Sequence, residues 1–301
     1  MLCILYVNLI TACLGLAALL VERALPAAWP RRWLWCLAIA ISMTLPGVYR
    51  AHHAWDVAGA SAHHAPETMR PMLDRAWWTR TNSLDGALNQ LWLATSGAVV
   101  VWSLIGMCWV AGAIHLSRRE RQDRSGGTLV DGVPVLVTDR LGPATVGLWR
   151  PQVLVPRWVL ALPALQRRYV LRHEEEHRRA HDARVLFALS LTLILLPWNL
   201  ALWWQLRRLH LAVEMDCDTR VVASLGDASA YGALLLKVAE AAAGGPRLQP
   251  GLLGGIGMLE RRLTALLAPT PVRPVQRVLL PVLALGVVAL VLMLPHPVVG
   301  R

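Results

Sequence analysis

Long apolar stretches alternate with polar, arginine-rich segments along this chain. Four runs contain no charged side chain and, apart from His115, no histidine; they occupy residues 1–21, 33–49, 91–116 and 278–294. A helix that crosses a bilayer needs about 20 apolar residues, with a lower limit near 17. The first and third runs meet this length, and the second and fourth are at its short end. The pattern therefore predicts four membrane-spanning helices.

The composition supports this prediction. Hydrophobic residues make up 55% of the 301 residues and charged residues only 16%, whereas soluble domains carry about 25% charged residues. The first run has no basic segment before it and no small-residue cleavage site after it, so we interpret it as a retained helix. The net charge of +11 comes almost entirely from arginines beside the apolar runs. This placement indicates an anionic membrane surface, and we expect no direct binding of nucleic acid.

The arginines also predict the orientation, because short cytoplasmic loops are enriched in basic residues. Arg31 and Arg32 precede the second run, and several more arginines follow the third run. The loop between these runs balances its acidic and basic residues. We therefore expect the N-terminus, this loop and the C-terminal tail to lie outside, and the central region to lie in the cytoplasm. The loop also contains histidines whose role is open: His52, His53, His63 and His64.

The chain divides into three parts by this pattern. Residues 1–116 contain three transmembrane helices and an external loop at about 50–88. Residues 117–276 are the part long enough for a cytoplasmic domain. Residues 277–301 form a fourth transmembrane helix and a short external tail.

The central domain begins with strand-like sequence. Residues 133–138 are rich in β-branched side chains, and residues 144–149 and 152–155 are two further extended pieces. Glycine and proline residues separate these pieces. From Leu160 onward the pattern is helical. We expect an α+β domain inserted into a multi-pass α-helical membrane protein.

One segment of this domain carries recognisable chemistry, the HExxH motif from His173 to His177. Positions four apart lie on one face of a helix, so both imidazoles can hold one ion. Glu174 lies beside that face, where its carboxylate can reach a metal-bound water and act as a general base. The alternative is a charged amphipathic helix with incidental histidines. The spacing favours a zinc site.

A zinc peptidase needs a third ligand and an open position for water. Glu214 and Asp218 are four positions apart, so one helix face offers a ligand and an acceptor that orients a ligand. Asp182, five positions after His177, is another candidate for the orienting role. We expect His181 to be a neighbour rather than a ligand, because a fourth protein ligand would close the site. The five cysteines show no CxxC spacing and predict no thiolate zinc site.

A fifth apolar run, residues 186–206, separates the motif from Glu214. Its length would let it cross the bilayer. One crossing would place Glu214 on the side opposite to His173 and His177, whereas zinc ligands lie about 2 Å from the metal. We therefore expect the run to be buried in the domain or to enter the inner leaflet and fold back, with Pro197 at the bend.

These residues together resemble the BlaR/MecR family of membrane metallopeptidases, the antirepressors of β-lactam resistance. The similarity extends over the whole chain and includes residues 169–172 before the motif and the Glu-x-x-Cys-Asp element at 214–218. The resemblance implies a gluzincin-like zinc metallopeptidase of the bacterial inner membrane. It also implies a site in which Glu174 is the catalytic base and zinc is bound by His173, His177 and Glu214.

The resemblance further implies a protein substrate. This would be a cytoplasmic protein, such as a winged-helix repressor of the BlaI/MecI type, cleaved after a signal. A membrane quality-control protease and a catalytically silent signalling scaffold are the alternatives. The chain ends seven residues after Leu294, so we expect no external penicillin-binding sensor domain. The signal and the oligomeric state stay open.

Overall fold

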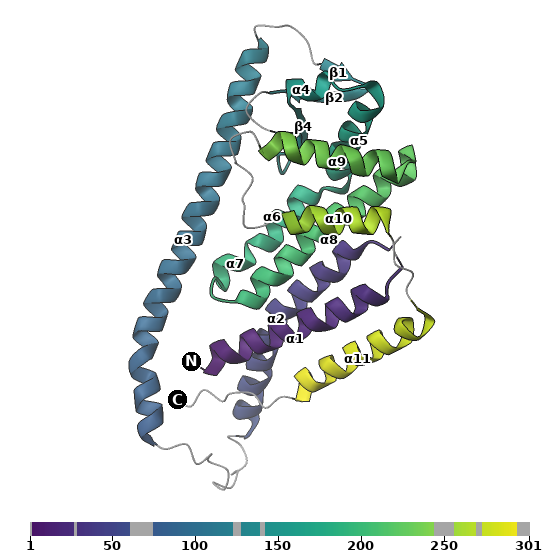
Figure 1. The fold of residues 1–301 in the computed structure, drawn as a ribbon. Coiled ribbons are helices and arrows are strands. Elements are labelled where there is room, and N and C mark those ends of the chain that lie inside the picture. Colours follow the sequence, from purple (N-terminus) through teal and green to yellow (C-terminus); the bar gives the residue numbers. More distant parts are fainter. Residues whose placement is uncertain are drawn as a thin grey trace.

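The computed structural model describes residues 2–26, 29–60, 75–122, 128–138, 142–243, 256–268 and 273–293. An α+β unit lies above a set of apolar helices in the view of Figure 1, and one long helix, α3, runs along the side of both. The apolar helices are α1 (Leu2–Ala24), α2 (Arg31–Ala60), α3 (Arg75–Gln122) and α11 (Pro274–Met293).

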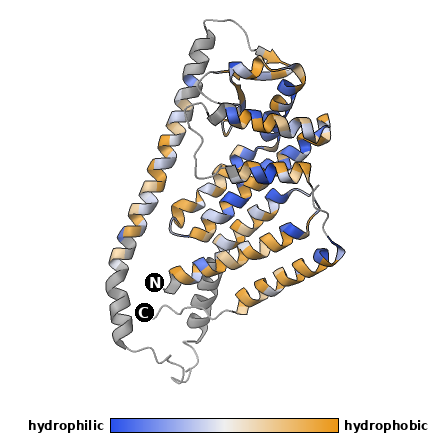
Figure 2. Cartoon of the chain, viewed as in Figure 1, coloured by the Kyte–Doolittle hydropathy of each residue, from blue (hydrophilic) through white to orange (hydrophobic). Residues whose placement is uncertain are grey.

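Three helices of the described chain are long and apolar enough to cross a bilayer by length and composition: Ile4–Ala24, Gln90–Trp109 and Pro274–Met293. They correspond to the first, third and fourth predicted runs. The second run forms α2, which starts with two arginines and does not meet the same criterion. Figure 2 shows apolar residues around α3 and α11, and many of these side chains are exposed, among them Trp102, Ile105, Val282 and Leu285. Such a large apolar surface is unfavourable in water and suits contact with lipid.

The residues expected to form the external loop, 50–88, are partly helical in the structure. Residues 50–60 continue α2 and residues 75–88 belong to α3. Residues 61–74, with His63 and His64, lie outside the described part of the chain. No proline interrupts α3. Because adding a residue to an existing helix costs much less than starting one, α3 extends beyond its apolar run at both ends.

The α+β unit begins with a four-stranded sheet of order β1-β2-β4-β3. Its strands are β1 (Thr128–Val130), β2 (Val133–Val137), β3 (Ala144–Val146) and β4 (Gln152–Val155). The central strands β2 and β4 are parallel, and β3 pairs antiparallel with β4 at the edge. The predicted extended segments are confirmed as β2, β3 and β4. The sequence analysis missed β1, although Asp131 and Gly132, both with positive φ, provide the Asp-Gly turn that is typical of a hairpin.

Seven helices of the described chain complete this unit: α4 (Arg157–Leu160), α5 (Ala164–Ala180), α6 (Asp182–Ser190), α7 (Thr192–Leu195), α8 (Leu200–Leu225), α9 (Ala228–Ala243) and α10 (Ile256–Leu267). Helix α5 packs against β3 and β4 on one side and against α8 on the other. Buried side chains of the sheet, α5, α8 and α9 form one core, which includes Val153, Tyr169, Cys217, Val221 and Tyr231.

The apolar run of residues 186–206 folds back, as the sequence analysis predicts. Helices α6 and α7 end before Pro197, and Asn199 caps α8 by accepting a hydrogen bond from Leu202 N. The Asn199 amide also donates to Thr11 Oγ1 over 3.0 Å, and Gln205 Nε2 donates to Thr11 O over 2.7 Å. Because Thr11 lies within the apolar span of α1, the turn reaches the middle of that helix and then returns.

Helix α8 connects the two parts of the molecule. At 26 residues it is roughly 39 Å long. Leu202, Leu206 and Leu209 in its first half are buried against α1 and α2, and its second half belongs to the core of the α+β unit. A Cβ atom on Gly15 of α1 would lie 2.5 Å from the Trp204 ring, so glycine permits the close approach of α1 and α8. The junction between the two halves carries Glu214.

Candidate metal centre

Helix α5 places the HExxH motif next to the sheet. His173 and His177 are one turn apart, and their Nε2 atoms are 3.2 Å from each other. The helix ends at His181, whose left-handed backbone (φ 56°) starts a new direction for α6. The backbone of His181 turns the chain between α5 and α6. The imidazoles of His173 and His177 face the adjoining helix α8.

Helix α8 brings Glu214 to this pair. One carboxylate oxygen lies 3.5 Å from His173 Nε2, and the other lies 3.6 Å from His177 Nε2. In a tetrahedral site with zinc–nitrogen bonds of about 2.0–2.1 Å, neighbouring donor atoms are about 3.3–3.4 Å apart. Each imidazole nitrogen therefore lies at about this spacing from one oxygen of the Glu214 carboxylate.

Cys217 lies one turn after Glu214 and offers a different donor set. His173, His177 and Cys217 present ligand atoms that lie within 4.8 Å of one another. The sulfur is 3.3 Å from His173 Nδ1 and donates to the His173 carbonyl oxygen over 3.3 Å. Glu214 instead faces Nε2 of both imidazoles. One ion bound through both Nε2 atoms would take Glu214 as its third ligand and leave Cys217 behind the His173 ring.

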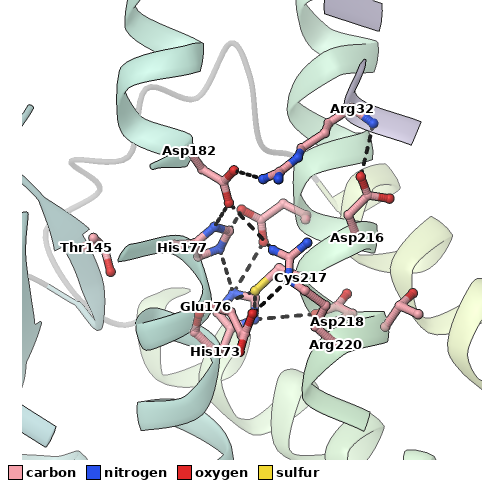
Figure 3. A network of polar contacts seen from close by, with 12 residues as sticks. Arg32, Thr145, His173, Glu176, His177, Asp182, Asp216, Cys217, Asp218 and Arg220 are labelled. Carbon is pink, nitrogen blue, oxygen red and sulfur yellow. Dashed lines mark hydrogen bonds and ion pairs between the residues drawn. The ribbon is translucent and has the colours of Figure 1, made fainter. Parts of the chain in front are cut away.

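On one side of the site, hydrogen bonds and an ion pair connect His177 through Asp182 to Arg32 of the apolar helix α2 (Figure 3). His177 Nδ1 donates to Asp182 Oδ2 over 2.8 Å, and Arg32 of α2 donates to the other Asp182 oxygen over 2.7 Å. Asp216 of α8 accepts hydrogen bonds from the backbone N–H groups of Arg31 and Arg32 at the start of α2. The start of α2 is therefore connected to the candidate metal centre.

On the other side, His173 faces residues of α8, α9 and α10. The Tyr231 hydroxyl oxygen is 3.0 Å from His173 Nδ1 and donates to Asp218 Oδ1 over 2.7 Å. Asp218 itself is 3.5 Å from His173 Nδ1, so Tyr231 bridges the two residues. Arg262 of α10 pairs with both oxygens of Asp218 and lies 2.9 Å from Glu214.

Electrostatics at this site favour a cation between the imidazoles. Burial raises the pKa of Glu214, but Arg262 and the two histidines outweigh burial and hold this pKa well below its usual range. Burial lowers the pKa of His173, but Cys217 and Glu214 raise it overall to about 10. The surroundings thus stabilise a carboxylate together with positive charge at the imidazoles. A divalent cation bound to neutral imidazoles would satisfy the same surroundings.

Glu174 lines a cavity together with the three donor groups. The cavity has a volume of about 510 Å³, and its wall includes Thr145 of the edge strand β3 and His210 of α8. The Thr145 hydroxyl is 2.6 Å from the Glu174 carbonyl oxygen and 3.1 Å from its carboxylate. This contact orients the Glu174 side chain and connects the motif to β3.

The other two glutamates of the motif are buried but fully paired. Glu175 accepts hydrogen bonds from Arg178 and Arg179 at 2.6–2.8 Å. Glu176 pairs with Arg172 over 2.7 Å and with an arginine of α8, at position 220, over 2.8 Å. A buried carboxylate is tolerated when it is paired and hydrogen-bonded, which accounts for the three consecutive glutamates.

The structure brings together all the site residues proposed from the sequence. His173, His177 and Glu214 converge, Glu174 lies in the adjoining cavity, and Asp182 contacts His177 directly. The sequence analysis gave no role at the site to five other residues that contact it: Arg32, Thr145, Cys217, Tyr231 and Arg262. Of these, only Cys217 carries a local signal, because it lies three positions after Glu214 on the same helix.

Comparison with known proteins adds a family match. The family model described as BlaR1 peptidase M56 matches residues 2–266, which include the candidate site and most of the described helices. The comparison with curated proteins and the comparison with solved structures found no match.

Proposed function

The chain belongs to the BlaR1 peptidase M56 family, and on this premise we propose that it is a membrane-embedded zinc endopeptidase that cleaves a cytoplasmic protein. The family match confirms the resemblance to the BlaR/MecR proteins and identifies the chain as a metallopeptidase. One observation carries the finer proposal: two imidazole nitrogens and a carboxylate converge within 3.6 Å of one another beside the Glu174 cavity.

We assign zinc to this site because of its donor atoms. Two imidazole nitrogens and one carboxylate, with space for a water, are the donor set of the gluzincin type of catalytic zinc site. His173, His177 and Glu214 would hold the ion. Asp182 and Tyr231 would fix the orientation of the two imidazole rings, because each contacts a ring through Nδ1.

The chain supplies a general base next to these ligands. When bound, zinc lowers the pKa of a coordinated water to about 7 and polarises a carbonyl group. The Glu174 carboxylate, oriented by Thr145, accepts the proton of the attacking water and later donates it to the leaving amine. His210, whose pKa is lowered by burial, lines the same cavity as a neutral N–H donor toward the charge that develops on the carbonyl oxygen.

The edge strand beside the cavity supports an extended peptide as the substrate. Strand β3 is the last strand in the sheet order, and residues 143–145 form part of the cavity wall. A peptide that pairs with this edge would gain backbone hydrogen bonds and place its carbonyl groups near Glu174. We therefore propose that the substrate is a polypeptide, cleaved at an internal peptide bond, rather than a small molecule.

Basic residues support a cytoplasmic position for the active site. Arg23 ends α1, Arg31 begins α2 and Arg277 lies in the first turn of α11, all at the ends of apolar helices that point toward the α+β unit (Figure 1). By the positive-inside rule, these residues support a cytoplasmic peptidase unit in a protein of the bacterial inner membrane. A Ser229→Cys variant tests this placement: the exposed α9 position should react with an impermeant maleimide only after the cells are opened.

A regulatory substrate, such as a winged-helix repressor, extends this proposal. A general quality-control protease would use the same site. Comparing the proteins that accumulate in cells with active and inactive enzyme separates the two. One DNA-binding protein that accumulates uncleaved supports the regulatory role, whereas many membrane proteins support quality control.

The decisive experiment replaces Glu174 with glutamine. We expect the variant to bind zinc as the native protein does, because Glu174 is not a ligand, and to lose peptide cleavage by a factor of about 10² or more. Zinc content is measured by mass spectrometry of the metal, and cleavage with a fluorogenic peptide. Arg168→Gln, an exposed change on the same helix, serves as the control. Full cleavage by Glu174→Gln would remove the proposed mechanism.

A further inference from the structure

A second cavity lies where the apolar helices α1 and α2 meet the α+β unit. Its volume is about 670 Å³, and α1, α2, α8 and α10 form its wall. Five arginines line it: Arg23, Arg31, Arg208, Arg261 and Arg262. Arg262 also lines the metal cavity, so the two cavities share one wall. The metal site uses none of the other four arginines.

The second cavity has an excess of positive charge. Its acidic lining residues are Glu22, Asp218 and Glu260, three against the five arginines. Glu22 pairs with Arg208, and Asp218 pairs with Arg262. Three arginines of the wall remain, Arg23, Arg31 and Arg261. Within the described chain, Glu260 is the one acidic residue of the wall that is not paired with an arginine.

Two of the arginines have buried nitrogen atoms without a hydrogen-bond acceptor. Within the described residues, the Nε atoms of Arg31 and Arg208 are buried and have no such partner. The Arg31 side chain makes a weak contact through Nη1 with Met215 Sδ at 3.9 Å. These two atoms are closed to the cavity, so the ligand chemistry follows from the five guanidinium groups of the wall, whose excess of positive charge suits a ligand with several anionic oxygen atoms. Arginine binds phosphate groups particularly well for this reason.

The position of the cavity identifies the source of such a ligand. The apolar span of α1 ends at Ala24, next to Arg23 and Leu25 in the cavity wall. In a membrane-embedded protein this is the level of the lipid phosphates, which attract basic side chains. Leu211 and Leu266 supply an apolar part of the wall, which suits the glycerol and upper acyl region of a lipid.

We propose that this cavity binds the phosphate of an anionic phospholipid from the leaflet that faces the peptidase unit. The phosphate chemistry follows from the cavity and its arginines alone. The lipid as its source rests on the membrane placement given under the proposed function. A free phosphate compound is the alternative source of the same chemistry.

Lipid retention by the full chain tests the proposal. The protein is purified in a neutral maltoside detergent, mixed with dioleoyl phosphatidylglycerol or dioleoyl phosphatidylcholine, and studied by native mass spectrometry. We expect one phosphatidylglycerol to be retained in preference to phosphatidylcholine. The double change Arg31→Gln and Arg261→Gln should weaken this binding roughly tenfold or more, since each basic residue contributes to attraction of an anionic lipid. Arg277→Gln, an exposed change at the corresponding end of α11, should alter it less than twofold.

Inorganic phosphate distinguishes the two sources. Displacement of phosphatidylglycerol by millimolar phosphate would support a general phosphate site, and retention of the lipid would support the lipid source. Equal retention of both lipids, an unchanged affinity in the double variant, or an equal loss in Arg277→Gln would overturn the proposal. Arg261→Gln alone, on the exposed face of α10, repeats the test if the double variant does not fold. Zinc content and peptide cleavage are measured in parallel, so that failure of lipid binding is distinguished from failure of the proposed enzyme.

Discussion

The two histidines of the candidate site are held by different parts of the molecule. His177 is bonded to Asp182 and through it to Arg32, so its orientation depends on the start of the apolar helix α2. His173 faces Tyr231, and its further contacts lie within the α+β unit. The comparison teaches that the two histidines of one candidate metal centre are anchored differently, His173 within the α+β unit and His177 through the apolar helix α2. A displacement of α2 would reach His177 first.

The largest expected effect comes from Glu214, which serves both sides. Glu214→Ala removes a proposed ligand. Mutation of a residue that only contacts a ligand lowers metal affinity by up to roughly 100-fold, and we expect a larger fall in zinc affinity here. Competition with a chromophoric chelator measures this affinity. Cys217→Ser is the matched control on the same helix and should have a much smaller effect. If Glu214→Ala kept its zinc and Cys217→Ser lost it, the His-His-Cys set would be the metal site.

Asp182 tests the side that is linked to α2. Asp182→Ala removes the acceptor for His177 Nδ1 and leaves Arg32 without its partner. We expect zinc affinity to fall about 10–100-fold, as is usual when the acceptor behind a metal-bound histidine is lost. The same chelator assay measures the change, and far-UV circular dichroism checks that the helices are retained. An unchanged affinity would contradict the orienting role.

Arg32 gives a smaller effect on the same side. Arg32→Gln keeps Asp182 as the acceptor for His177 but removes its ion pair with α2, so we expect a loss of zinc affinity of roughly tenfold or less. A double-mutant cycle with Asp182→Ala should be strongly non-additive, because both changes act through one chain of contacts. Additive losses would show that α2 does not act through Asp182.

Tyr231 lies on the His173 side of the site, and its substitution has the smallest expected effect on zinc affinity. Tyr231→Phe removes the hydroxyl between His173 and Asp218 but keeps the ring packed against Tyr169, at a centroid distance of 5.4 Å. We expect a loss of zinc affinity of only a few-fold, because Cys217 still contacts His173 Nδ1. Combined with Arg32→Gln, the change should be additive, since the two residues contact different imidazoles. Strong coupling would mean that the two sides are not independent.

Much of the fold and of the site could be predicted from the sequence. Uncharged runs of sufficient length predict apolar helices, and the structure contains them. The HExxH spacing predicts one helix face with two imidazoles, because the helical repeat is a local property. The fold-back of residues 186–206 was also predictable, because ligands of one ion must converge. Helix ends were less predictable: α3 extends into the expected loop, and α2 does so although Pro46 and Gly47 lie near the end of its apolar run.

The sequence by itself determined the local chemistry of this protein: the ligand types, their spacing within α5 and α8, and the apolar character of the long helices. Only the tertiary structure decided which distant groups surround that chemistry. Arg32 and Asp182 are 150 positions apart, and Arg262 lies 44 positions from Asp218. Hydrophobic periodicity repeats over a few residues and carries no information about such pairs. They are set by the packing of whole helices, which brings α2 and α10 to opposite sides of one candidate metal centre.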